Sequence, residues 1–283
     1  MDVIRARTAG FCMGVGLALQ KLEAALQERA ADTARICTLG PIIHNPQVLE
    51  DYARKGVARL EEPEEARPGD MVVIRAHGVT RQTEERLRAG GARVLDATCP
   101  KVKKAQLSIA RATAGGAALL LFGEADHPEV RGLVSYAGGP AYVFGDMEAL
   151  EALSLPEDRP YVLASQTTQD RALFAVIERL LRGRLPGLTV LATICDATRE
   201  RQDEARSIAA RADVMVVVGG RESGNTRRLA DVARAAGIAT YHVETVDELR
   251  PEFFAQKARA GLTAGASTPK SLIEAAEERL TSL

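Results

Sequence analysis

The chain has few cysteines and no closely spaced pair of them. Its 283 residues include four cysteines, and no C-x-x-C pair is present. Disulfide scaffolds and zinc ribbons both depend on cysteines that are close in sequence. The spacing therefore argues against both, and it favours metal ligation or buried packing of thiols in a reducing compartment.

A long hydrophobic run and a cationic leader are also missing. No apolar run reaches the roughly 18 residues that a membrane span needs. The segment Met1–Ile4 opens directly into a strand pattern, without the basic region and apolar core of a signal peptide. We therefore expect a cytoplasmic protein with no membrane partner.

Lysine and aromatic residues are scarce. Only 7 of the 37 basic residues are lysines, aromatic residues make up 4% of the chain, and the arginines alternate with acids. No basic face with interleaved aromatics appears, so no nucleic-acid partner is expected. The rest of the composition, with 46% hydrophobic residues and a net charge of -1, is that of a globular protein with two or three domains.

Three cysteines divide the chain into nearly equal thirds. Cys99 lies 87 residues after Cys12, Cys195 lies 96 residues after Cys99, and the remainder through both termini is 100 residues. A period near 90 residues is domain-sized, so it predicts three small pseudo-symmetric domains whose cysteines converge on one metal centre. Each cysteine follows a β-rich run and precedes an expected helix starting near Gly16, Lys101 and Arg199, respectively. Cys37 lies inside an expected strand and is interpreted as core packing.

Between the cysteines, short apolar strands alternate with amphipathic helices. This alternation predicts an α/β fold with parallel sheets, whose ligands bind beyond the carboxyl ends of the strands. Six strands lead directly into polar loops: Arg35–Leu39, Met71–Ile74, Ala118–Phe122, Tyr161–Ala164, Val214–Val218 and Gly261–Thr263.

The last third of the chain ends in a helix with no strand after it. The other two thirds each end in a strand before the next cysteine, so Val3–Arg5 is the strand that completes the last domain. The predicted domains are therefore residues 14–98, residues 99–194, and residues 195–283 together with 1–13.

Three of the four histidines fall in equivalent polar loops. A single histidine at a strand end is usually a capped or solvated loop residue. The coincidence of His44, His77 and His127 favours a functional site instead. His242 lies inside the expected strand Thr240–Val243 and is interpreted as structural.

The remaining polar loops offer hydroxyls and an amide. Helix capping explains each of them individually, but together with the histidines and several helix N-termini they favour a cradle for phosphate or diphosphate. Glu129 is either a proton donor to such a site or an ordinary first-turn helix acid, and the residues alone do not separate these alternatives. The hydroxyl and amide residues are Thr167, Thr168, Ser223, Asn225, Thr226 and Ser267.

Three thiolates on an axis suit a cubane iron–sulfur cluster better than zinc, because three ligands leave one iron open for substrate. Over essentially its whole length, the chain resembles the hydroxymethylbutenyl diphosphate reductases, the last enzymes of the methylerythritol phosphate route to isoprenoids. The matching segments are Ala9–Val15, Gly40–Asn45, Arg75–Val79, Asp96–Pro100, His127–Val130, Ser165–Thr168, Thr193–Cys195, Ser223–Thr226 and Thr263–Ser267.

The resemblance implies three pseudo-three-fold-related small α/β domains around a central [4Fe–4S] cluster. Its ligands would be Cys12, Cys99 and Cys195, with the substrate hydroxyl at the open iron. Glu129 and Thr167, beside His127, would be the catalytic residues that relay protons. The allylic diphosphate would be held by His44, His77, His127, Thr168, Ser223, Gly224, Asn225 and Ser267.

In the implied reaction, two electrons and two protons remove the hydroxyl of (E)-4-hydroxy-3-methylbut-2-enyl diphosphate as water and give isopentenyl and dimethylallyl diphosphates. Gly10–Gly16 misses the spacing of a dinucleotide fingerprint, so the electrons are expected from a separate protein, either a ferredoxin or a flavodoxin. Gly224 stands where some relatives have serine, so only its backbone N–H would serve the phosphate. Glu222 stands where many relatives have asparagine.

The alternatives to this function are another three-cysteine cluster dehydratase, such as quinolinate synthase, and a non-catalytic iron–sulfur sensor.

Overall fold

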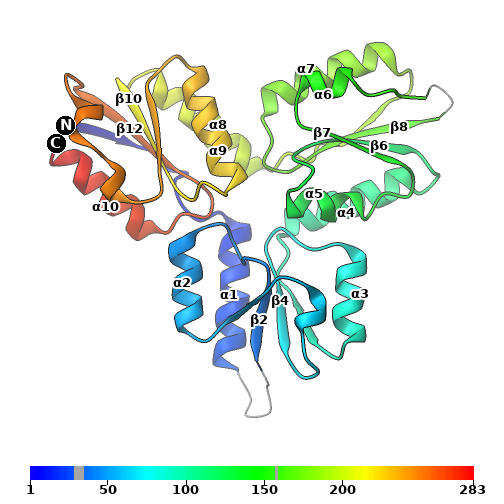
Figure 1. Ribbon diagram of the computed structural model, residues 1–283. Coiled ribbons are helices and arrows are strands. Elements are labelled where there is room, and N and C mark those ends of the chain that lie inside the picture. The colour runs from blue at the N-terminus through cyan, green and yellow to red at the C-terminus, as the bar shows by residue number, and fades with distance from the viewer. Residues whose placement is uncertain (29–34, 157–158) are drawn as a thin grey trace. The chain divides into compact units, whose positions relative to one another are not determined.

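In the part of the chain that the structure describes, the strands form three parallel four-stranded sheets (Figure 1). The computed structural model describes residues 1–28, 35–156 and 159–283. In spatial order the sheets are β3-β2-β4-β5, β7-β6-β8-β9 and β1-β12-β10-β11. The strands are β1 Asp2–Arg5, β2 Ile36–Leu39, β3 Ala58–Leu60, β4 Met71–Ile74, β5 Arg93–Asp96, β6 Ala118–Phe122, β7 Ala141–Phe144, β8 Tyr161–Ser165, β9 Thr189–Val190, β10 Val214–Val218, β11 Thr240–Val243 and β12 Arg259–Ala264.

Helices alternate with these strands along the chain. The α-helices are α1 Met13–Gln27, α2 Pro46–Arg54, α3 Arg81–Ala89, α4 Pro100–Thr113, α5 Pro128–Val134, α6 Met147–Glu151, α7 Arg171–Arg184, α8 Asp196–Ala209, α9 Gly224–Ala235 and α10 Lys270–Thr281. The described residues also form the short 3-10 helices η1 Pro63–Glu65, η2 Val246–Glu248 and η3 Pro251–Phe254. No helix in residues 1–28, 35–156 and 159–283 is long and apolar enough to cross a membrane.

The three sheets share one topology. In each, the first strand in chain order lies between the second and the third, and the fourth lies outside the third. The last sheet follows this rule only when β1 counts as its fourth strand. β1 pairs in parallel with β12, in a register that runs from Asp2 opposite Arg259 to Arg5 opposite Leu262. The prediction that the N-terminal strand completes the last sheet is confirmed.

Both faces of each central strand are covered, which explains why these strands read as continuous apolar runs. In β6, Leu120 packs toward α7, and Leu119 and Leu121 pack toward α4 and α5. In β10, Val216 packs toward α10, and Val217 packs toward α8 and α9. Strands buried in this way hold their carboxyl ends, and the loops that follow them, in fixed positions.

The chain divides into two compact units. The first unit comprises residues 1–16, 43–51 and 196–283 and contains the β1-β12-β10-β11 sheet. The second unit comprises residues 17–42 and 52–195 and contains the other two sheets. The domain boundaries at residues 14–98, 99–194 and 195–283 with 1–13 stay a prediction.

Two helices begin earlier than expected, and Cys37 lies where it was expected. α1 and α8 begin at Met13 and Asp196, three residues before the expected starts at Gly16 and Arg199. Cys37 is fully buried in the core of the β3-β2-β4-β5 sheet, which confirms its structural assignment.

Candidate active site

Each of the three cysteines stands at the start of a helix. Cys12 directly precedes α1, Cys99 caps α4, and Cys195 directly precedes α8. All three are half-buried. The partial positive charge at a helix N-terminus stabilises a thiolate, which is the form that binds metals. The backbone N–H of Val15 lies 3.5 Å from Cys12 Sγ and points this charge at the sulfur.

The backbone of each cysteine is held in the same way. Cys12 N–H donates to Ala266 O at 3.1 Å, Cys99 N–H to Ala76 O at 2.9 Å, and Cys195 N–H to Thr167 O at 2.9 Å. The three acceptors are each the second residue after β12, β4 and β8, respectively, which hold equivalent places in their sheets. The three cysteines are therefore equivalent in their backbone hydrogen bonds, as the spacing of the cysteines in the sequence led us to expect.

The connection from β1 to Cys12 is the longest of the three and is anchored by α8. Glu204 accepts the backbone N–H groups of Arg7 and Thr8, both at 2.9 Å, and the Thr8 hydroxyl at 2.7 Å. Burial alone raises the pKa of Glu204, but these hydrogen bonds outweigh it and hold the pKa below its usual value. Three residues earlier on α8, the buried Arg201 donates to Gly10 O at 2.7 Å. α8 therefore fixes the loop that carries Cys12.

The other two cysteine connections have anchors of their own. Asp96 accepts Thr98 N–H at 2.9 Å and the Lys103 ammonium at 3.2 Å, just before and after Cys99. Before Cys195, the Thr193 hydroxyl accepts Ser165 N–H and donates to Ser165 O, both at 2.8 Å. None of the three anchors resembles another, although the cysteines they support are equivalent.

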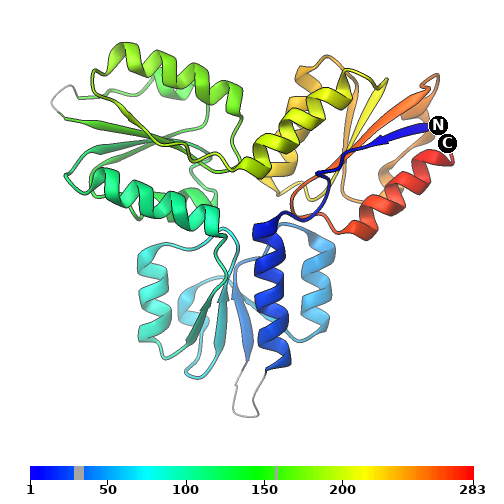
Figure 2. The ribbon, with the colours of Figure 1, turned by 180° about the vertical axis from the view of Figure 1, so that it is seen from behind.

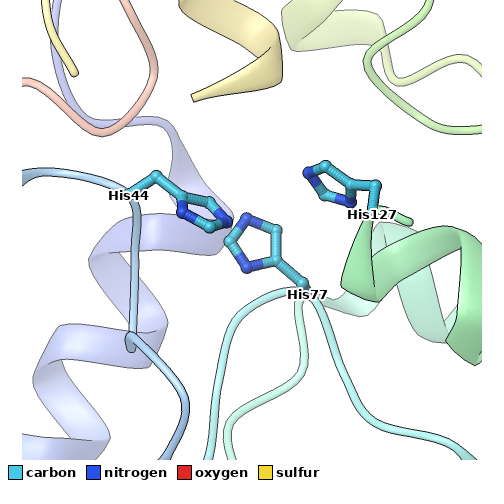
Figure 3. Close-up of side chains that lie close together, drawn as sticks. All are labelled: His44, His77 and His127. Carbon is cyan, nitrogen blue, oxygen red and sulfur yellow. The ribbon is translucent and has the colours of Figure 1, made fainter. Parts of the chain in front are cut away.

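Two of the expected histidines meet in the second unit. The rings of His77 and His127 lie edge to face with centroids 5.3 Å apart (Figure 3). His127 caps α5, and its Nδ1 accepts the Glu129 N–H at 3.1 Å. Because Nδ1 accepts, a neutral His127 carries its proton on Nε2, which is the donor nitrogen of the ring.

Glu129 and Thr167 form a buried pair, also in the second unit. Glu129 is 1% exposed. One carboxylate oxygen accepts the Thr167 N–H at 2.6 Å, and the other accepts the Thr167 hydroxyl at 3.1 Å. The next residue, Thr168, has a buried hydroxyl with no hydrogen-bond partner among the described residues. A buried acid linked to one hydroxyl and adjacent to another is suited to proton transfer.

Loops of the first unit build a second group of polar atoms. Ser223 caps α9 by accepting the Thr226 N–H at 3.4 Å, so Gly224 and Asn225 occupy the first turn of this helix. The Ser267 hydroxyl donates to His44 O at 3.0 Å. Gly219 has φ +144°, and a Cβ there would lie 2.5 Å from the Thr268 hydroxyl, so only glycine allows this close packing.

Asn45 ends the matching segment Gly40–Asn45, but the sequence assigned it no role in the site. It is 1% exposed, and its Oδ1 accepts the Val48 N–H at 3.0 Å as it caps α2. Its Nδ2 and the Nδ2 of Asn225 are buried donors without an acceptor among the described residues. Buried donors of this kind are expensive to leave unmet, which favours an anion as their partner. The Asn-Pro pair at the start of α2 is a sequence pattern that indicates the helix cap. It does not indicate that the side-chain amide of Asn45 is a buried donor.

The structure thus brings together His77 with His127 and Glu129 with Thr167 in the second unit. In the first unit it brings Ser267 to His44 and places Ser223, Gly224 and Asn225 at the start of α9. His242, interpreted as structural, lies with Nε2 2.8 Å from Gly219 O. Burial lowers the pKa of His242, which favours the neutral ring.

The chain matches known proteins over its full length. Residues 3–281 match the family described as LytB protein. A 4-hydroxy-3-methylbut-2-enyl diphosphate reductase of Desulfovibrio desulfuricans is 68% identical and covers 100% of both chains. A solved structure with 39% sequence identity has a TM-score of 0.70, and the match covers 100% of this chain and 99% of that chain. It is the structure of an (E)-4-hydroxy-3-methyl-but-2-enyl diphosphate reductase, the terminal enzyme of the non-mevalonate pathway.

A third match supports the fold alone. The structure of the E-1-hydroxy-2-methyl-but-2-enyl-4-diphosphate reductase from Plasmodium falciparum has a TM-score of 0.93 at 24% identity. It covers 99% of this chain, and this chain covers 88% of it. The α/β architecture with three parallel sheets is therefore that of a known fold.

Proposed function

Because the chain belongs to the LytB protein family, we propose that it is a 4-hydroxy-3-methylbut-2-enyl diphosphate reductase. The observation that carries this function is the 68% identity to such a reductase over the full length of both chains. In this reaction two electrons and two protons convert (E)-4-hydroxy-3-methylbut-2-enyl diphosphate to isopentenyl or dimethylallyl diphosphate and water. It is the terminal step of the non-mevalonate pathway to isoprenoids.

Cys12, Cys99 and Cys195 are the proposed ligands of a [4Fe–4S] cluster with one open iron. The donor set fits this group, because each thiol stands at a helix start and each backbone N–H binds an equivalent carbonyl. When bound, the cluster supplies a Lewis-acidic iron for the substrate hydroxyl and a conduit for the electrons. The thiolate ligands of such a cluster need a reducing compartment, which supports a cytoplasmic location.

The diphosphate is the proposed partner of the buried donors. Asn225 Nδ2 and Thr168 Oγ1 lack a hydrogen-bond partner among the described residues, which an anion with several acceptor oxygens would supply. The N-terminus of α9, with the backbone N–H of Gly224, adds a favourable dipole. The full set proposed to hold the diphosphate is His44, His77, His127, Thr168, Ser223, Gly224, Asn225 and Ser267.

Glu129 and Thr167 are proposed to deliver a proton to the departing hydroxyl, with His127 beside them. When Glu129 is protonated, its Oε2 passes the proton to Thr167 Oγ1, and the threonine hydroxyl gives its own proton to the leaving oxygen. The 3.1 Å contact between Oε2 and Oγ1 supports this relay. The His127 contact to the Glu129 backbone holds the start of α5, and with it the carboxylate, in position.

Electrons are proposed to come from a separate protein, a ferredoxin or a flavodoxin. The test of the function is anaerobic purification, iron and sulfide analysis, and turnover of the allylic diphosphate with reduced methyl viologen. We expect about four irons per chain and formation of both isoprenoid diphosphates. A cluster without turnover would indicate a sensor, and turnover of a carboxylate substrate instead would indicate a different dehydratase.

A further inference from the structure

Helix α4, which begins directly after Cys99, has an unusual charge distribution. Lys101, Lys103 and Lys104 lie among its first five residues, Arg111 lies in its last turn, and none of its 14 residues is acidic. Three of the seven lysines of the whole chain are therefore concentrated at one helix start. This cluster stands out against a chain in which the cations otherwise alternate with acids.

The stability of the helix does not explain these lysines. The N-terminus of a helix carries partial positive charge, so cations in the first turn are unfavourable there and acids are favourable. Lys103 has a structural role, because its ammonium lies 3.2 Å from the Asp96 carboxylate. Lys101 and Lys104 flank it on the same helix, and Lys104 is exposed. Residues that break a local rule in this way are expected at functional positions.

Lys101, Lys104, Leu107 and Arg111 form one face of α4, which we call the α4 surface. They recur every three or four residues and therefore lie along one side of the helix. The opposite side, with Ala105 and Ile109, packs on the β7-β6-β8-β9 sheet (Figure 2). Leu107 is 43% exposed, and Lys104 and Arg111 are exposed as well. The α4 surface is thus an apolar residue surrounded by cations.

Within the second unit, helix α1 also presents an exposed leucine and a cation. Leu17 is 37% exposed, and Lys21 follows it one turn later on the same side of the helix. The Lys21 ammonium donates to Asp96 O at 2.7 Å, three residues before Cys99. A further cation therefore contacts the connection to this cysteine, one helical turn from an exposed leucine.

We propose that the α4 surface is the docking site for the electron donor, a small acidic one-electron carrier protein. This inference rests on the proposed function, in which Cys99 is a cluster ligand. A cationic surface steers an acidic partner electrostatically, and a small apolar centre suits the brief, limited contacts of electron-transfer proteins. Two encounters serve each turnover, and each oxidises one reduced carrier by one electron. The two electrons, with two protons, reduce one substrate molecule and release one water.

The test is the double charge reversal Lys101→Glu with Lys104→Glu. Both new acids would lie near the helix N-terminus, where the dipole favours them, and the melting temperature of the variant is measured to verify that the fold is retained. With a reduced acidic [2Fe–2S] ferredoxin at low ionic strength, we expect the second-order rate constant for reduction of the enzyme to fall by about 10-fold or more. The difference from wild type should shrink as salt is raised through about 0.15 M, because exposed charges are then screened.

Reduced methyl viologen and a matched variant are the controls. Methyl viologen is small and cationic, so the double variant should be reduced by it, and turn over substrate, at wild-type rates. Arg250→Glu with Lys257→Glu reverses two exposed cations of the first unit and should leave ferredoxin kinetics unchanged. Equal loss with both donors, a raised KM for the diphosphate, unchanged ferredoxin kinetics, or an equal loss in the control variant would each overturn the proposal. Absence of wild-type turnover with methyl viologen would instead contradict the proposed function.

Discussion

The substitution Glu129→Gln separates proton delivery from the structural role of this buried acid. The glutamate accepts two hydrogen bonds from Thr167, at 2.6 Å from its N–H and at 3.1 Å from its hydroxyl. A glutamine keeps both contacts. Its Oε1 still accepts the N–H, and its amide nitrogen donates to the threonine hydroxyl, which turns to accept. The shape of the site and the position of α5 are therefore preserved.

The Glu129→Gln substitution should lower the stability of the fold only slightly and the reaction rate strongly. Exchanging two hydrogen bonds to a charged group for two neutral ones removes about 1–2 kcal/mol, partly offset by the desolvation that a buried charge no longer suffers. The amide has no proton to give as an acid. Losing a general acid lowers the rate by about 10²- to 10⁴-fold, and the lower figure corresponds to about 2.7 kcal/mol of activation free energy.

Single-turnover kinetics under anaerobic conditions provide the measurement. The reduced variant with bound substrate should retain its iron and sulfide content and its affinity for the diphosphate, and form product at least about 100-fold more slowly. Thr167→Val should show a comparable loss, because it removes the hydroxyl that links Oε2 to the leaving group, and Thr167→Ser should keep most of the rate. Near-native product formation by Glu129→Gln would refute the relay and leave Glu129 as an acid that only holds the Thr167 loop.

Three further predictions concern the framework of the site. Cys12→Ser, Cys99→Ser and Cys195→Ser should each lose or damage the cluster while Cys37→Ala keeps it, and iron content with visible absorbance checks this; a full cluster in any serine variant would contradict the ligand set. Deleting residues 1–8 should destabilise the protein by roughly 3 kcal/mol or more in urea unfolding, because it removes the partly buried Val3 and Ile4 and exposes the edge of β12; unchanged stability would mean that β1 contributes little. Glu204→Gln should be less stable than wild type at neutral pH, and because the folded pKa of Glu204 lies below its unfolded value of about 4.3, this difference should shrink as the pH falls below about 4. A pH-independent difference would rule out the charge of Glu204 as the anchor of the Cys12 loop.

Much of the fold follows from periodicity that the sequence displays. The near-equal cysteine spacing predicted three α/β sheets, and the absence of a last strand predicted that β1 joins β12. Helix starts were less predictable. Gly14 and Gly16 are poor helix formers, each less favourable than alanine by roughly 1 kcal/mol, so the local pattern placed the start of α1 too late. In the structure Gly14 and Val15 are buried, and packing overrides that preference.

The contacts that orient the site were not predictable from sequence patterns. Glu204 reaches Thr8 across 196 positions and Arg201 reaches Gly10 across 191, and nothing local marks either residue among the many acids and arginines of α8. The link between Glu129 and Thr167 spans 38 positions and depends on the register of β6 and β8. The tautomer of His127 likewise follows only from the Glu129 N–H that its Nδ1 accepts.

The three repeats agree where they carry cysteine and differ where they carry other polar groups. After the equivalent strands β4, β8 and β12, the same backbone carbonyl accepts a cysteine N–H, but the neighbouring side chains are His77, Thr168 and Ser267. A cubane cluster presents nearly equivalent irons, so identical ligand positions suit it. The proposed substrate, an allylic diphosphate, has a charged end, a hydroxyl end and no symmetry, so it would require a different group from each repeat. On the proposed assignment, repetition of the scaffold serves the cluster and divergence of the loops serves the diphosphate, and this division accounts for backbone equivalence and side-chain variety at adjacent residues.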